Sequence, residues 1–513
     1  MLQAAATCLD AAIVGKDVTR VRRAVAALGS VRIPVVADDA DDAGADDADD
    51  DDADAYAGAA LQALAKALFL FPRDEGVVLL GLRALSSVAG SVRLRRGALV
   101  LMDMLDGRVW DQLAIGTCRA MAEFADCAAV LGAALICLDI FNESSPVLMR
   151  IQVQEGCVGL TAQALVRHLD DSRVLVGAVM CALGWANVAT CQDLACIVPP
   201  LVRAAQRRPV VDKKFPFQST VVRVLGILST AMVHPADVVL LMDALPWLGT
   251  MVAGPGNRDL AMRAMTCVYN MVNVLFSRDG CPQRDDLLVA MAHHVALPLR
   301  RCLWIFVNDL LMVMSIMACA DQLFRAGVRR GAVPPCLWDL FAVVVATANV
   351  VLCAGDTYLD MEGHVCRSPD TCTCDLDVTF IALSCLCRAA LPGDRDACPE
   401  WQAQLAMAPD AARAAVGRYP HVPNLASMAR HLCRLLVVHR NLFAAKTVLH
   451  GLTLDHASAE GGVDGADPFA VCGHGVGAGP RGLGDRALDA GAGHGCGQSG
   501  VPAGGAPAAV ASH

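Results

Sequence analysis

The sequence has few aromatic residues, and this shortage limits the possible fold classes. Aromatic side chains make up 4 % of the 513 residues, whereas hydrophobic residues make up 55 %. Sheet-rich chains usually carry more aromatic residues, isoleucine and threonine, so a β-fold is disfavoured. The apolar content is mostly Ala, Val, Leu, Met and Cys. Most of these residues favour helices and let them pack closely. We therefore predict an all-α protein.

The common catalytic motifs are also missing. The chain has no Walker loop, no G-x-S-x-G, no H-E-x-x-H and no kinase signature. No pair of titratable residues stands at a recognised catalytic spacing. We predict a protein that is not an enzyme and has no cofactor. The alternative, an enzyme with an unrecognised site, would need a cluster of titratable groups in one deep pocket.

A basic domain is absent as well. The net charge is −10, and it becomes +1 when the eleven aspartates between Asp38 and Asp54 are left out. Nucleic-acid binders more often carry a basic domain, so no nucleic-acid partner is expected. The first twenty residues lack the basic start and long apolar core of a secretory signal. Many of the 23 cysteines lie in apolar runs, as small buried residues do in a reducing compartment. We expect a cytoplasmic protein, with the nucleus as the alternative location.

Composition divides the chain into four parts. Residues 1–36 are predicted to form short amphipathic helices, and residues 37–55 an acidic disordered linker that is too charged to pack. Residues 56–452 carry the fold, and residues 453–513 form a Gly/Ala-rich tail that is expected to be disordered. The acidic run is interpreted as a solvated linker. The alternatives are that the acidic run binds a basic partner or forms an autoinhibitory contact.

Internal repetition is the strongest positive signal. A small apolar helix centre recurs around Leu85, Met121, Leu183, Leu225 and Met265. Most of these steps are about 40 residues, a period typical of stacked helical hairpins or triplets. A longer step crosses "FNESSPVLMRIQ", which indicates an insertion or a degenerate repeat.

A second recurring sequence pattern marks helix starts. A glycine stands at positions 156 and 331, and proline pairs stand at 199–200 and 334–335. Glycine permits a sharp turn after a helix, and proline is tolerated in a first helical turn.

These phrases resemble the armadillo repeat family. "RGAVPPCLWDLF" and "CIVPPLVRAA" are similar to the start of the family's second helix, and "CALGWANVA" and "CVYNMVN" to the end of its third. The resemblance covers residues 58–345, and the related HEAT repeat remains an alternative. It implies a right-handed superhelical α-solenoid of armadillo/HEAT-type repeats.

The resemblance also implies a binding site. It places Asn187 and Asn270 where armadillo proteins hydrogen-bond the backbone of an extended peptide. Trp185 and Trp304 are candidate aromatic contacts on the same surface. Alternatively, the two asparagine amides bond to a neighbouring helix, and the two tryptophans fill space between repeats.

One cysteine-rich segment raises the question of a metal. His364, Cys366, Cys372 and Cys374 lie within "HVCRSPDTCTCD". Zinc is bound by such side chains, but the two-residue spacing of a zinc knuckle is absent. No metal site is predicted, and these residues are only weak candidates.

The run from Val174 to Cys191 is uncharged and long enough to be considered as a membrane span. Because repeat signals flank it, we interpret it as a buried repeat helix and expect no membrane span. The predicted function is a non-catalytic protein-interaction scaffold or adaptor. The alternatives are a nuclear-transport-type adaptor that reads basic peptides and a multi-span membrane protein.

Overall fold

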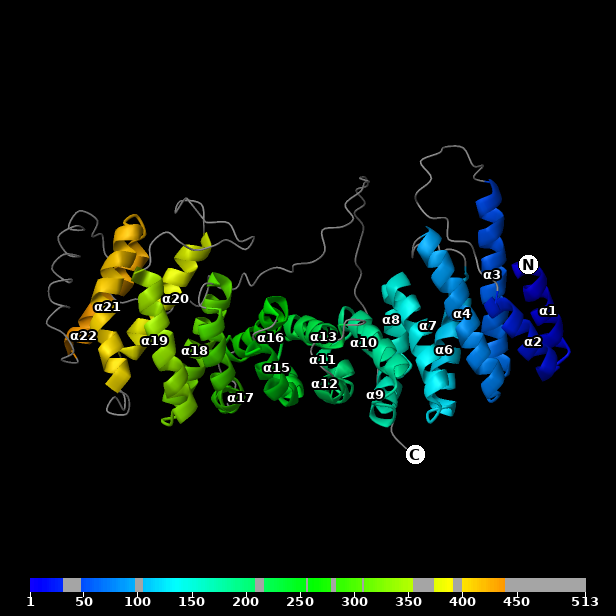
Figure 1. Ribbon diagram of the computed structural model, residues 1–513, viewed down its shortest axis with the longest axis horizontal. Helices are drawn as coiled ribbons and strands as arrows, with labels where there is room; N and C mark the ends of the chain where they lie inside the picture. The colour runs from blue at the N-terminus through cyan, green and yellow to red at the C-terminus, as the bar shows by residue number, and fades with distance from the viewer. Residues whose placement is uncertain are drawn as a thin grey trace, which may run out of the picture. The chain divides into compact units, whose positions relative to one another are not determined.

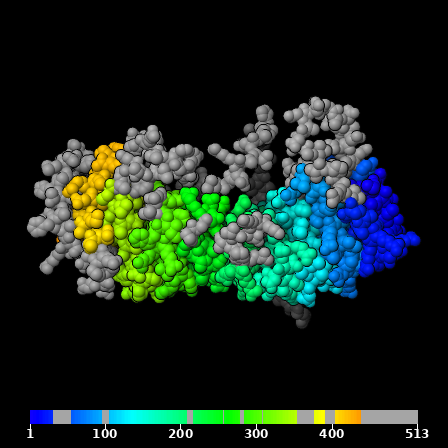
Figure 2. Space-filling model, viewed as in Figure 1, coloured from blue at the N-terminus to red at the C-terminus, as the bar shows by residue number. Residues whose placement is uncertain are grey.

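The computed structural model describes residues 1–30, 48–96, 105–207, 216–254, 257–277, 283–306, 309–353, 373–390 and 399–438. All regular structure in these ranges is helical, from α1 (Leu2–Val14) to α22 (Pro423–Val438). The helices follow one another in chain order, each beside its neighbours in the sequence (Figure 1). The space-filling view shows the same order (Figure 2). The prediction of an all-α protein is confirmed for this part of the chain.

The helices form two rows, in which nearly every helix packs on the next member of its own row. The main row consists of α2 (Val18–Ser30), α4 (Glu75–Arg96), α7 (Ala128–Ser144), α10 (Ser172–Ala186), α13 (Phe217–Ala231), α16 (Arg258–Phe276), α18 (Leu310–Arg329), α20 (Thr373–Ala389) and α22. The second row consists of α1, α3 (Ala48–Leu70), α6 (Gly107–Glu123), α8 (Pro146–Gln154), α9 (Cys157–Arg167), α12 (Val198–Arg207), α15 (Leu245–Val252), α17 (Arg284–Ile305), α19 (Pro335–Cys353) and α21 (Pro399–Arg418). Stacking of this kind is an α-solenoid, as predicted.

The repeat unit differs along the stack. In the centre, three helices form each unit: α8–α9–α10, then α11 (Cys191–Leu194) with α12 and α13, then α14 (Pro235–Leu241) with η1 (Met242–Ala244), α15 and α16. On both sides the units are two-helix hairpins, such as α3–α4 and α17–α18. Helical repeat proteins are built from two-helix or three-helix units, and the described residues contain units of both kinds.

Buried cysteines connect the helices of the main row. The Sγ atom of Cys137 in α7 lies 3.1 Å from the carbonyl oxygen of Leu82 in α4, and that of Cys181 in α10 lies 3.2 Å from Leu135 in α7. Cys267 in α16 repeats the contact at 3.5 Å to Leu225 in α13. Burial raises the pKa of Cys137 and of Cys267 to about 12, so these thiols keep their protons. Many of the cysteines are therefore small core residues that also donate a weak hydrogen bond.

Close packing of α10 on α7 depends on Gly177. A Cβ at this position would lie 2.6 Å from Cβ of Leu135, whereas a Cβ at Gly159 in α9 would meet nothing within 4 Å. We expect Gly177→Ala to lower the free energy of unfolding by about 1–3 kcal/mol, because the two helices must separate. Gly159→Ala should raise it by about 0.5–1 kcal/mol, because alanine favours the helix. Urea denaturation of both variants tests this, and equal effects would contradict the packing.

The predicted helix-start signals are confirmed. Gly156 and Gly331 have φ of 79° and 70°, a left-handed conformation that glycine adopts easily. They precede α9 and α19. Pro199 and Pro200 lie in the first turn of α12, and α19 begins at Pro335.

The predicted repeat register is wrong at one position. Met121 lies in α6 of the second row, whereas Leu85, Leu183, Leu225 and Met265 lie in main-row helices. The equivalent main-row helix is α7, which the pattern missed because helices of both rows have the same apolar period. The segment interpreted as an insertion or degenerate repeat forms the end of α7 and α8, the first helix of a three-helix unit.

The N-terminal helices belong to the stack. Residues 1–30, within the segment 1–36 for which short helices were predicted, contain α1 and α2, which pack on α3 and α4. Arg22 in α2 forms two hydrogen bonds, of 3.0 and 2.8 Å, with the carboxylate of Asp74, which precedes α4. No boundary separates these helices from the repeats.

The acidic linker is shorter than predicted. Helix α3 begins at Ala48, so the prediction of a linker over 37–55 is wrong for residues 48–55. Residues 37–47 and 439–513 lie outside the described residues. The predicted end of the fold at 452 and the predicted tail over 453–513 therefore fall in a part of the chain that the structure does not describe.

One cysteine pair departs from the expectation of free thiols. Cys118 in α6 and Cys157 in α9 form a disulfide with a Cα–Cα distance of 5.8 Å. The two residues are 39 positions apart, about one repeat, and stacking of consecutive units brings them together.

Several helices are long and apolar. The run beginning at Val174 forms α10, which has 15 residues and is shorter than the about 20 that a span needs. Four other segments are long and apolar enough to cross a membrane: Glu75–Leu94, Pro235–Val252, Leu310–Arg329 and Pro335–Cys353. Between 50 % and 61 % of the apolar window in each is buried in the stack.

Candidate interaction surface

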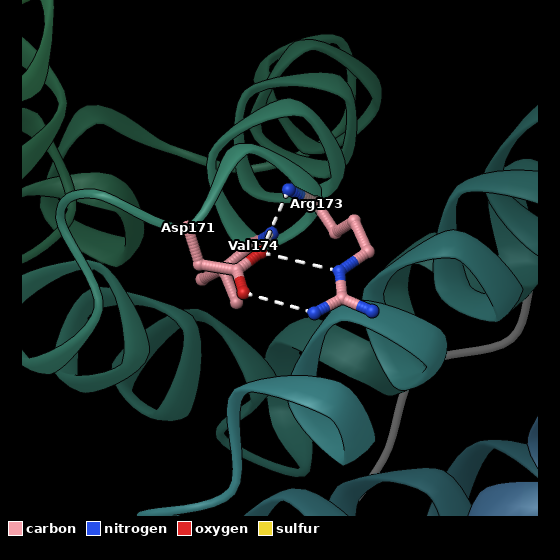
Figure 3. Close-up of polar contacts among 3 residues, drawn as sticks. All are labelled: Asp171, Arg173 and Val174. Carbon is pink, nitrogen blue, oxygen red and sulfur yellow. Dashed lines mark hydrogen bonds and ion pairs between the residues drawn. The ribbon is translucent and has the colours of Figure 1, made fainter.

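A charged turn fixes the start of α10 (Figure 3). The Asp171 carboxylate accepts hydrogen bonds from the backbone N–H of Arg173 at 2.9 Å and of Val174 at 3.4 Å. The Arg173 guanidinium donates to the same carboxylate at 3.4 and 3.1 Å. Hydrogen bonding from Arg173 lowers the pKa of Asp171, so the cap stays ionised at neutral pH. This cap sets where Asn187, at the other end of α10, emerges.

Asn187 and Asn270 both lie on main-row helices, two units apart, as the repeat pattern predicts. Asn187 follows the last turn of α10, is exposed, and donates to the carbonyl oxygen of Leu183 in its own helix at 3.0 Å. Asn270 is half-buried in α16 and donates to Oγ of Ser229 in α13 at 3.1 Å. Neither bond uses the amide oxygen, which remains available as an acceptor.

The two candidate tryptophans have opposite environments. Trp185 is 0 % exposed, and its indole N–H donates to Gln152 of α8 at 2.8 Å. Its assignment to a partner-binding surface is therefore wrong: it fills space within one repeat unit. Trp304 is 71 % exposed, but it lies in α17 of the second row, away from the row that holds both asparagines.

Side-chain hydrogen bonds continue from Asn270 along the main row. Nε2 of Gln322 in α18 donates to Oδ1 of Asn273 in α16 at 2.9 Å. Burial raises the pKa of Tyr269, and a hydrogen bond with Asn273 opposes this. The buried side-chain oxygen of Gln322 has no hydrogen-bond partner within the described residues, although buried amides are nearly always satisfied.

Two arginines extend this series of side-chain contacts along the main row to α20. Arg325 in α18 contacts the Asp321 carboxylate at 2.6 Å, and Arg388 in α20 contacts it at 3.5 Å. Arg325 also lies 3.4 Å from Oγ of Ser384. Burial lowers the pKa of Arg388, although Asp321 counteracts this. Two arginines therefore share one buried carboxylate.

These residues form what we call the polar stripe. Its members are Ser229, Asn270, Asn273, Asp321, Gln322, Arg325 and Arg388. On α16 and α18, partly exposed positions recur every three or four residues, and Thr266 and Ala318 are two of them. The amides of the stripe and Arg325 occupy further positions of the same series. Positions so spaced share one helix face. The stripe thus lies on the face of the main row that is left open.

The sequence prediction found one member of this stripe and missed the others. Only Asn270 matched the armadillo phrase. Asn273 follows it by one turn and was a visible candidate. Gln322, Arg325 and Arg388 lie in repeats whose sequences depart from the phrase, so only spatial stacking reveals their common face.

A carboxyl group on α7 makes the stability of the fold depend on pH. Burial raises the pKa of Asp139 to about 7, with a further rise from Glu143 and an opposing effect of Arg93. The ordinary value of 3.8 applies to the unfolded chain. Between these values the folded state binds more protons, so stability falls as pH rises from about 4 to 7.

Asp139→Asn should remove this dependence. At pH 8 the variant is expected to be about 2–4 kcal/mol more stable than the wild type, a difference that shrinks towards pH 4. Urea denaturation across this range measures it. The exposed Asp126→Asn change serves as control and should alter stability by less than about 0.5 kcal/mol. A constant difference for Asp139→Asn at all pH values would contradict the burial of the charge.

The weak metal candidates cannot be placed together. His364, Cys366 and Cys372 lie outside the described residues, and Cys374 lies in the first turn of α20. Among the described residues, no group of three or more His, Cys, Asp or Glu side chains could hold a metal ion.

Comparison with known proteins gives no family. No family model matches the chain, and the search of curated proteins found no significant match.

The search of solved structures finds, among others, three matches of low identity. An engineered protein has 14 % identity and a TM-score of 0.39, with 88 % of this chain and 98 % of that chain covered. A structure from work on a phosphorylation switch that controls the interaction between cadherin and beta-catenin has 12 % identity and a TM-score of 0.38, with 86 % and 98 % covered. A circular tandem repeat protein has 13 % identity and a TM-score of 0.19, with 88 % and 95 % covered. At these values the likenesses carry no argument, and the helical repeat fold rests on the helix contacts described above.

Proposed function

We propose that this protein is a non-catalytic scaffold or adaptor of the armadillo/HEAT kind. It holds a segment of a partner protein against the open face of the main row, from α10 to α20. The observation that supports this is the polar stripe, in which the half-buried amides of α16 and α18 bond to each other and to Ser229 of α13. Amides on consecutive repeats suit the backbone of an extended chain, because they donate and accept hydrogen bonds at once.

Dimensions support an extended occupant. Neighbouring helices pack about 8–10 Å apart. An extended peptide advances about 3.3 Å per residue, so roughly three peptide residues separate one main-row helix from the next. A chain laid across the row would therefore meet a stripe residue at regular intervals. Affinity would come from many modest contacts rather than from one pocket.

Removing two stripe amides tests the proposal. The full chain, wild type or Asn270→Ala/Gln322→Ala, is used to capture partners from extracts of its own cells. We expect the double variant to lose at least about 90 % of the captured partner, equal to about 1.4 kcal/mol or more. The matched control is Gln112→Ala/Gln206→Ala, which removes two exposed amides from α6 and α12 of the second row. Equal capture by all three proteins would move the site away from the main row.

A membrane protein is the second candidate, and the four long apolar segments favour it. We propose instead that these helices serve the stack and that the protein is cytoplasmic or nuclear. Each of them packs on neighbours in its own row and in the other row. Preparation of the full chain without detergent tests this: a stable soluble monomer or oligomer is expected, and recovery only in detergent would support the membrane alternative.

A further inference from the structure

The open face of the main row is apolar on α7 and α10. We infer that this part of the face binds an apolar anchor of the partner segment, a pair of aliphatic side chains next to a lysine or arginine. The inference rests on the proposed function. It extends the docking face by one helix, to α7, and names the chemistry of the segment that reaches it.

Four apolar side chains form this part of the face. Before Asn187, the central positions of α10 that are not buried are Val176, Met180, Leu183 and Gly184. Positions spaced by three or four residues share one helix face. Ile136 on α7 is 41 % exposed and lies beside them. We call Ile136, Val176, Met180 and Leu183 the apolar patch.

Close packing of α7 and α10 makes these side chains one surface. A Cβ on Gly177 would lie 2.6 Å from Cβ of Leu135 and 3.6 Å from the backbone nitrogen of Ile136. Ile136 is therefore level with the turn of α10 that carries Val176 and Met180. Single exposed apolar residues are common on protein surfaces, whereas a group of them on adjacent helices is typical of an interaction site.

The same face is polar further along the row. Thr230 at the end of α13 is exposed, and Asn270, Asn273 and Gln322 are half-buried amides of α16 and α18. Helix α10 carries the patch and, at its end, the exposed Asn187. A segment laid across the row would therefore bury side chains at α7 and α10 and form backbone hydrogen bonds with the later helices.

A carboxyl group beside the patch selects the charge of the neighbouring side chain. Asp139 lies one turn after Ile136 and makes no hydrogen bond or ion pair within the described residues. The charges that act on it are Glu143 of α7 and Arg93 of α4, and the thiol of Cys181 on α10 keeps its proton. Arg93 already pairs with Glu143. A lysine or arginine of the segment would give Asp139 a cation of its own.

The spacing of an extended chain suits the two helices. Alternate side chains point to the same side and lie about 7 Å apart. Neighbouring helices pack about 8–10 Å apart. Two aliphatic residues at positions i and i+2 of the segment would therefore reach α7 and α10 in turn.

Three synthetic fluorescent peptides of about 12 residues test the inference. The first has leucine at two alternate positions followed by lysine, in a background of serine and glutamine with a photo-reactive benzophenone. The second has glutamine in place of both leucines, and the third has glutamine in place of the lysine. At pH 8 Asp139 is ionised. With the full-length protein at this pH, the first peptide should bind saturably and at least about tenfold more tightly than either other peptide. Its cross-links should map to α7 or α10.

Variants of the full-length protein identify the contacts. Met180→Gln removes an apolar side chain from the patch with little change in size, and should weaken the first peptide about tenfold. Met262→Gln makes the same change at another half-buried position, on α16, and should leave the affinity unchanged. Asp139→Asn should abolish the preference for the first peptide over the third while keeping the preference for leucine. Equal effects of the two methionine variants would overturn the assigned patch.

The outcomes separate this inference from the proposed function. If the first and second peptides bind equally, or if cross-links fall outside α7 and α10, the apolar anchor is wrong. Capture by the Asn270→Ala/Gln322→Ala variant then still decides whether the docking face stands. Equal binding of the first and third peptides overturns the basic neighbour. If the full-length protein forms a dimer that Met180→Gln dissociates, the patch joins two copies of this chain and the inference also fails.

Discussion

Replacement of Trp185 by alanine is expected to lower the free energy of unfolding by about 3–5 kcal/mol. The side chain is fully buried between α10 and its neighbours, and its N–H donates to Gln152 at 2.8 Å. The change leaves a large cavity and removes the hydrogen-bond partner of a buried amide. Urea denaturation followed by circular dichroism measures the effect.

Trp304→Ala is the matched control. This tryptophan is 71 % exposed on α17, so its truncation should change the free energy of unfolding by less than about 0.5 kcal/mol. The pair thus separates a structural tryptophan from a surface one. A small effect for Trp185→Ala would show that α8 and α10 do not pack as described.

The second large effect concerns the carboxylate shared by two arginines. Asp321→Ala leaves Arg325 and Arg388 without their common counter-charge in a largely buried position. Loss of one member of a buried ion pair costs about 3–5 kcal/mol, and partial exposure of both arginines places the expected value near 3 kcal/mol. The loss should appear as a lower denaturation midpoint of the segment that includes α18 and α20.

Asp286→Ala provides the comparison at the surface. Asp286 pairs with Arg330, and both side chains are about half exposed. Exposed ion pairs contribute about 0–1 kcal/mol, so this variant should be close to the wild type. If the two aspartate variants were equally stable, Asp321 would not hold α18 and α20 together.

The fold class was predictable from the sequence because helical periodicity and a repeat length of about 40 residues are local signals. Gly156, Gly331 and the proline pairs marked helix starts correctly, since each acts through backbone conformation alone. The row to which a helix belongs was not predictable. Met121 in α6 and Leu85 in α4 have similar apolar surroundings, and only contacts between helices distinguish them.

The candidate site was predictable only in part. Asn270 was identified because a polar residue interrupts an apolar helix at a repeat position. Trp185 was proposed as an aromatic contact on the same surface but proved to be buried. A side chain near the end of a helix faces either the core or the surface depending on a turn of about 100° per residue. The arginines at 325 and 388 were missed, since Arg388 reaches Asp321 and Arg325 in α18 from 67 positions further along the chain than Asp321.

The central claim is that the open face of the main row is the docking surface. The most direct test introduces a photo-cross-linking residue at Asn187, Thr230 or Gln322 in the main row, and at Val166 or Val350 in the second row, where both valines are more than half exposed. Irradiation in cells, followed by identification of the attached protein, reads out the contacts. The same partner attached at all three main-row positions, and absent from Val166 and Val350, is the predicted result. Attachment at the second-row positions alone would contradict the account.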